Sequence, residues 1–117
     1  MDEAEKRFLA ETADAKHTFE TIRMSVDARR KARIQKIYDQ YNDEIHSVKG
    51  AILRATSKHE YFELQERLHS ILDEVSAKVH LIEQDYEREL APAKTELNKV
   101  WAPAQTRLWE SRNGRRK

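Results

Sequence analysis

Apolar side chains recur with an eleven-residue period along both halves of this chain. In the second half, successive apolar positions are separated by steps of 4, 3 and 4 throughout. This stripe comprises Leu64, Leu68, Ile71, Val75, Val79, Ile82, Tyr86, Leu90, Ala93, Leu97, Trp101, Ala104 and Leu108. Eleven residues over three turns keep such a stripe on one face of a nearly straight helix. The pattern predicts one long amphipathic helix.

The first half shows the same period with more faults. Its stripe comprises Phe8, Thr12, Ala15, Phe19, Ile22, Val26, Arg30, Ile34, Ile37, Tyr41, Ile45, Val48 and Ile52. The chief fault is Arg30, a charged residue on the apolar face. The pattern predicts a second long helix.

One break separates the two stripes. Ser57 and Glu60 have the spacing of a capping box, in which each side chain satisfies a backbone N–H of the other residue. Gly50, slightly earlier, either weakens the preceding helix or supplies a left-handed cap for it. We expect a single domain over 1–117: a helix over about 3–52, a turn over 53–57, a helix over 58–112, and a basic tail over 113–117.

Charge placement favours an antiparallel pairing of the two helices. When Phe8 is set opposite Leu108, the numbers of facing residues sum to about 116. The basic run at 29–33 then faces the acidic stretch at 83–89, and the acidic start faces the basic end. As a set, these pairs select the antiparallel arrangement. The predicted fold is all-α, an elongated antiparallel two-helix hairpin with a coiled-coil-like eleven-residue repeat, which completes a helical bundle by self-association.

The same pairing accounts for Arg30. In this pairing Arg30 lies opposite Tyr86 of the second helix. The Arg30 guanidinium would lie on the Tyr86 ring, with Glu83 or Glu87 as its counter-ion. The alternative is a helix interrupted between Met24 and Arg30, with Arg30 in solvent. The local fit favours the polar layer.

A short duplication marks the C-terminal part of the chain. The segment at 90–97 matches the segment at 101–108, and each contains an Ala-Pro-Ala sequence around Pro92 or Pro103. Each proline removes a helical hydrogen bond, so it either bends one helix or begins a new short one. Over 90–108 this repeat is similar to those of exchangeable apolipoproteins, whose helices lie on lipid. Their apolar face is broad. In this chain the two stripes meet in a narrow apolar seam between the helices, which is better suited to contact with another helix.

Composition limits the remaining possibilities. The chain has 117 residues, 37% of them charged, and a formal net charge of +1. A core of one seam is thin, which favours self-association. The absence of cysteine fits a cytoplasmic protein, and the acidic start lacks the layout of a signal peptide. No apolar run reaches membrane-spanning length, so we expect no membrane partner.

Candidate chemistry is sparse. Asp43 with His46 and Glu66 with His69 have carboxylate-x-x-His spacing, but the other inward carboxylates of a helical metal centre are missing. His17, His59 and His80 are scattered, and two glycines cannot form a phosphate loop. We therefore expect no enzyme activity, no catalytic residues, no metal and no cofactor.

Two basic clusters support an alternative function. They are candidates for phosphate contacts in a nucleic-acid-binding helical protein, and comprise Arg29, Arg30, Lys31 and Arg33 together with Arg115, Arg116 and Lys117. The competing interpretation is that acidic residues of the facing helix neutralise the first cluster.

Large apolar residues beside the seam favour protein–protein contact. Aromatic side chains in such positions often anchor interfaces, and the alternative is that these residues only thicken the core of the hairpin. The candidates are Leu9, Tyr38, Leu53, Tyr61, Phe62, Leu72, Leu81, Trp101 and Trp109. We expect a non-catalytic interaction module, which acts as a structural, adaptor or regulatory protein. Its partner is a second copy of the chain, and a larger protein assembly is a further candidate.

Overall fold

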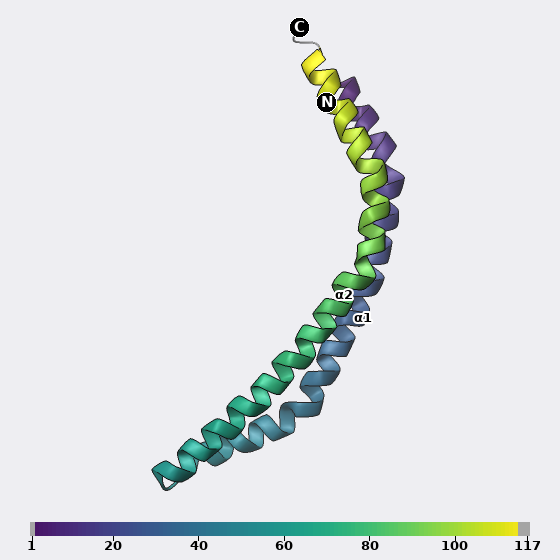
Figure 1. The fold of residues 1–117 in the computed structure, drawn as a ribbon. Coiled ribbons are helices and arrows are strands. Elements are labelled where there is room, and N and C mark those ends of the chain that lie inside the picture. The colour runs from purple at the N-terminus through teal and green to yellow at the C-terminus, as the bar shows by residue number, and fades with distance from the viewer. Residues whose placement is uncertain (1, 115–117) are drawn as a thin grey trace. The chain divides into compact units, whose positions relative to one another are not determined.

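The computed structural model describes residues 2–114 and contains two long α-helices joined by a short turn (Figure 1). Helix α1 spans Glu3–Leu53, and α2 spans Lys58–Gly114. The described range contains no strand. The prediction of an all-α helical hairpin is confirmed.

Both helices begin with side-chain caps. The Asp2 carboxylate accepts a hydrogen bond from the backbone N–H of Glu5 at 2.8 Å, which satisfies one of the exposed donors of the first turn of α1. At the start of α2, Ser57 Oγ accepts from the backbone N–H of Glu60 at 3.1 Å, as predicted. The Glu60 carboxylate, however, accepts from the backbone N–H of Thr56 at 3.3 Å. The reciprocal bond of the predicted capping box therefore reaches one residue further back.

The turn is shorter than predicted because α1 includes Leu53. Gly50 lies inside this helix, and no described glycine has a positive φ, so the left-handed cap proposed for Gly50 is wrong. At the end of α1, the backbone N–H of Arg54 instead donates hydrogen bonds to the carbonyl oxygens of Gly50 and Ala51, at 3.3 and 3.1 Å. This shared bond tightens the last turn.

Helix α2 continues through both prolines. The alternative in which each proline begins a new short helix is therefore wrong. The residues that follow them, Ala93 and Ala104, are 8% and 1% exposed, so each proline precedes a buried contact with α1. A bend at each proline stays a prediction.

Packing divides the hairpin into two units. Unit 1 comprises the described parts of 1–27 and 87–117, and unit 2 comprises 28–86. In each unit a segment of α1 packs on a segment of α2. The prediction of a single domain stays a prediction.

The buried residues are those of the two stripes. Every described residue in the buried class lies on one of them: Thr12, Val26, Tyr41, Val48, Ile71, Val75, Ile82, Leu90, Ala93 and Ala104. Thr12 is tolerated there because its hydroxyl donates to the Phe8 carbonyl at 2.8 Å, so no polar group is left unpaired. The eleven-residue periodicity therefore identifies the core.

Ile22 is the exception. It is the one described stripe residue in the exposed class, at 39%, and the side chain of its neighbour Arg23 is exposed to the same extent. The Arg23 guanidinium is held by Glu20 at 2.8 Å.

Unit 2 contains a compact cluster of buried residues around Tyr41, Val48, Ile71 and Val75. The Tyr41 hydroxyl donates to the Glu74 carboxylate at 2.8 Å and accepts from Lys78 Nζ. This hydrogen bond to Tyr41 raises the pKa of Lys78, against a smaller opposing effect of burial. A tyrosine fits the seam because its hydroxyl reaches polar partners at the edge.

Ion pairs between the helices confirm the predicted register in each unit. In unit 1, Glu11 pairs with Arg107 at 2.6 Å, and Glu5 pairs with Arg112. In unit 2, Arg33 pairs with Asp85 at 3.2 Å. The numbers in these three pairs sum to 117 or 118, whereas those of Arg30 with Glu83 and of Glu44 with Arg67 sum to 113 and 111, so the pairs lie on both sides of the expected 116.

The polar layer at Arg30 is also confirmed. The guanidinium carbon lies 4.6 Å from the centre of the Tyr86 ring, and Arg30 Nη1 lies 3.0 Å from the Glu83 carboxylate. Because α1 is continuous through this region, the interrupted-helix alternative is wrong.

Candidate functional site

The turn of the hairpin carries three of the predicted interface residues. Leu53 is 88% exposed, Phe62 60% and Tyr61 42%. The rings of Tyr61 and Phe62 meet edge to face, with centroids 5.6 Å apart. The two rings form an exposed aromatic pair on the first turn of α2, directly after the loop.

Near the chain ends, the candidates divide into exposed and packed residues. Leu9 and Trp109 are 50% and 65% exposed. Trp101 is half-buried, and its ring packs edge to face on Phe8 with a centroid distance of 4.9 Å. Trp101 therefore contributes to the packing of unit 1, whereas Leu9 and Trp109 remain available to a partner.

The middle of the hairpin carries the other three candidates. Tyr38 is 49% exposed, Leu72 42% and Leu81 60%. All three belong to unit 2 and lie outside its buried cluster. Large apolar side chains are thus exposed along the length of unit 2 as well as at the turn.

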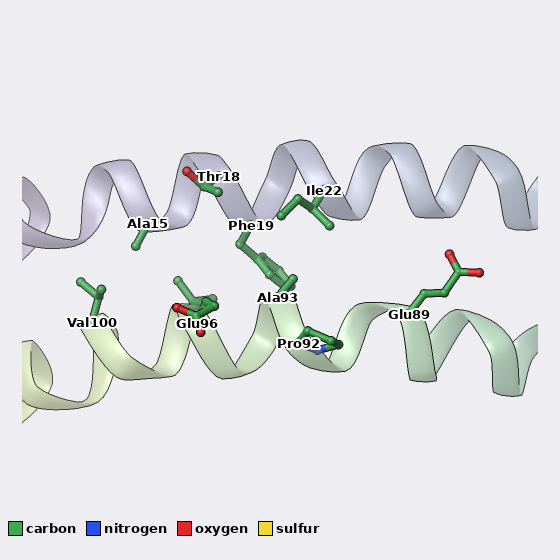
Figure 2. A pocket seen from close by; sticks show the side chains of 10 residues that line it. Ala15, Thr18, Phe19, Ile22, Glu89, Pro92, Ala93, Glu96 and Val100 are labelled. Atoms are coloured by element: carbon green, nitrogen blue, oxygen red, sulfur yellow. The ribbon is translucent and has the colours of Figure 1, made fainter.

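An open apolar groove of about 430 Å³ lies between the two helices of unit 1. Figure 2 shows Phe19 pointing from α1 across to Ala93 of α2, with Ile22 beside it and Pro92 below. The small side chains of Ala15 and Ala93 leave the space that a larger pair would fill. The groove is therefore an open, mainly apolar recess on the surface of unit 1.

Carboxylates from α2 lie along this groove. Its lining includes Glu89 and Glu96, together with Thr18, Leu97 and Val100. Glu96 is paired with Lys99 at 2.8 Å. The groove could not be predicted from the sequence, because periodicity identifies which face is buried but does not show how completely the facing side chains fill it. The available signal was that the two stripes carry small residues here, Ala15 in α1 and Ala93 in α2.

The first basic cluster is engaged within the hairpin. Arg30 contacts Glu83 and Tyr86, and Arg33 contacts Asp85. Arg29 and Lys31 also have interaction partners. The second cluster, Arg115, Arg116 and Lys117, lies outside the described residues.

The candidate metal ligands do not form a site in the described range. No group of three or more histidine, aspartate or glutamate residues within 2–114 could hold a metal ion. His59 instead pairs with Glu63 along the surface of α2, at 3.0 Å. Over the same range, neither helix has a stretch long and apolar enough to cross a membrane.

Comparisons with protein-family models, with curated proteins and with solved structures give no significant match.

Proposed function

We propose that this protein is a non-catalytic helical interaction module that associates with a second copy of itself. Its place in a cell would be that of a structural, adaptor or regulatory protein, and a larger protein assembly is a further partner. The observation that carries the proposal is the surplus of exposed apolar side chains. Within residues 2–114, eleven large apolar residues are at least 38% exposed, and all of them except Ile22 lie outside the two stripes.

The distribution of these residues supports protein contact. They occur at the turn, along unit 2 and near the chain ends, as extended helical surfaces do when they pack on other helices. The groove in unit 1 adds an apolar recess of about 430 Å³. A helix ridge from a partner would fit such a recess, as in ridge-into-groove packing.

The non-catalytic part of the proposal follows from the character of these surfaces. The groove is lined mainly by apolar side chains, and Glu96 at its edge is paired with Lys99. Catalytic sites instead bring several polar groups together around a reacting atom. The proposal also includes a cytoplasmic location and a coiled-coil-like seam, both from the sequence argument above.

Nucleic-acid binding receives less support. Arg30 and Arg33 would have to leave Glu83 and Asp85 to contact phosphates. Each transfer would replace one ion pair with another while exposing a carboxylate next to the nucleic acid.

The thermal midpoint should depend on protein concentration if two copies associate. A dimer of folded chains is stabilised by mass action, so Tm rises as concentration increases. We expect circular dichroism melts at about 2, 20 and 200 μM to give progressively higher Tm values. A Tm that is the same at all three concentrations would contradict self-association.

A further inference from the structure

The groove of unit 1 is as large as the pockets in which proteins bind small molecules. Its volume is about 430 Å³, and it lies between two segments of helix that belong to the same unit. Small-molecule pockets have volumes of about 300–1,000 Å³ and are lined mainly by apolar side chains, with a few polar groups that fix the ligand. The polar groups of this groove therefore indicate which class of molecule it would bind.

The larger part of the lining is apolar. Seven of the ten lining residues have apolar side chains. Among them, Ile22 is 39% exposed and Val100 is 38% exposed, so an apolar ligand would remove their surface from water. The half-buried Phe19 adds an aromatic ring, against which an aromatic or aliphatic group can pack. The lining therefore favours a ligand with an apolar body.

The remaining lining residues are two glutamates and a threonine. Glu89 and Glu96 lie seven residues apart on α2, which is about 10 Å along the helix axis. Figure 2 shows them on either side of Phe19. The Thr18 hydroxyl can donate or accept a hydrogen bond. No lysine, arginine or histidine of the described range lines the groove, so the charged groups of the lining are both negative.

The existing contacts of these carboxylates leave room for a further hydrogen-bond donor. Glu96 pairs through Oε1 with Lys99 at 2.8 Å, and the two side chains are 71% and 65% exposed. Such an exposed pair contributes little to stability. Glu89 also has an interaction partner. Because a carboxylate has two oxygens and about four acceptor sites, one partner does not use up its capacity.

We propose that the groove of unit 1 binds an organic cation, with an aromatic or aliphatic body and a protonated amine. The body packs on Phe19, Ile22 and Val100, and the ammonium group donates hydrogen bonds to Glu89 or Glu96. An anion of the same shape is disfavoured, because both carboxylates repel it. This inference goes beyond the proposed function, which requires no small-molecule ligand.

Three probes with the same ring system and different charges test the proposal. They are naphthylmethylammonium, naphthylmethanol and naphthoate, each titrated at neutral pH into the full-length chain and followed by amide NMR spectra. We expect the ammonium probe to shift the amide signals of Ala15, Phe19 and Ala93. It should bind at least about fivefold more tightly than the alcohol, because hydrogen bonds to charged groups are stronger, and naphthoate should bind most weakly.

Charge variants with a matched control locate the preference for a cation. Glu89→Gln with Glu96→Gln removes both charges of the groove, and Glu87→Gln with Glu110→Gln removes two exposed charges of α2 outside its lining. We expect the first pair to raise the dissociation constant of the ammonium probe by about fivefold or more and that of the alcohol by less than about twofold. The control pair should change either constant by less than about twofold.

A second matched pair tests whether the probes occupy the groove itself. Ala15→Leu adds a larger side chain to the lining, and Ala13→Leu adds the same side chain at an exposed position of α1 outside it. We expect Ala15→Leu to weaken the ammonium probe by about tenfold or more, because the added atoms fill the space of the ligand. Ala13→Leu should change its affinity by less than about twofold. Far-ultraviolet circular dichroism verifies that every variant keeps the helix content of the parent.

Three results would overturn the proposal. The first is equal affinity for the three probes, and the second is an ammonium affinity that the Glu89→Gln, Glu96→Gln variant leaves unchanged, since either shows an apolar recess without preference for cations. The third is the absence of groove shifts at a probe concentration of about 5 mM. None of these results bears on self-association, which is measured without a ligand.

Discussion

Replacing Ile82 by alanine should lower the free energy of unfolding by about 2–4 kcal/mol, whereas the same replacement at Leu81 should lower it by less than about 0.5 kcal/mol. The two residues are neighbours in α2, but Ile82 is 5% exposed and Leu81 is 60% exposed. Truncating Ile82 removes buried apolar surface and leaves a cavity beside α1, while truncating Leu81 removes atoms that already contact water. The difference isolates the contribution of the seam.

Urea unfolding followed by circular dichroism measures both variants. The protein concentration must be the same in every experiment, because the stability of an associating protein depends on it. Equal losses for Ile82→Ala and Leu81→Ala would show that the eleven-residue stripe does not define the core.

Replacing Arg29, Arg30 and Arg33 together by glutamine should lower stability by about 1–2 kcal/mol. The Arg30 side chain is 27% exposed and stacks on Tyr86, so its removal takes away packing as well as charge. The contact between Arg33 and Asp85 is more exposed and contributes less. Most of the loss should therefore come from the polar layer.

A second set of substitutions tests whether these charges act as one network. Glu83→Gln with Asp85→Asn removes the facing acids. Combining both sets should cost less than the sum of the separate losses, because residues that share contacts are not additive. Strict additivity would show that the two clusters act independently.

The same arginine variant separates protein interaction from nucleic-acid binding. If the cluster contacted phosphates, its loss would weaken binding to DNA or RNA, and the affinity of the parent would fall steeply with salt. We expect the parent to show no tight, salt-sensitive binding in fluorescence anisotropy. Such binding, if abolished by the triple variant without a change in Tm, would favour the nucleic-acid alternative.

The sequence predicted the core because burial follows periodicity. All the buried residues within 2–114 belong to the two stripes, including the small Ala93 and Ala104 and the polar Thr12. It also predicted the pairing of the helices, because complementary charges at Glu11 and Arg107 restrict the register. Even the apparent fault at Arg30 was interpretable, because its partner layer contained an aromatic ring and a carboxylate.

The exposure of single side chains, the helix cap and the groove could be predicted less well from the sequence. Ile22 belongs to the stripe but is 39% exposed, because it lines the open groove between the helices, and periodicity does not show where such a groove lies. The cap on Thr56 depends on the path of the loop, which the spacing of Ser57 and Glu60 does not specify. The groove depends on how much space the side chains near Ala15 and Ala93 leave, which is a property of packing.

The candidate interface was predicted as a set of residues rather than as a surface. Single exposed leucines and tyrosines are ordinary on helices, so their presence alone does not select a side. The interhelical ion pair of Arg67 and Glu44 shows which flanks of α1 and α2 lie together in unit 2, and periodicity alone does not give this.

Sedimentation equilibrium of the unmodified chain tests the central claim, self-association, most directly. The chain has a mass of 13.9 kDa. We expect the weight-average mass to rise from this value at low concentration to about twice this value at tens of micromolar, which is typical of dimers with micromolar dissociation constants. A mass that remains at 13.9 kDa up to about 1 mM, in a protein with full helix content, would contradict the account.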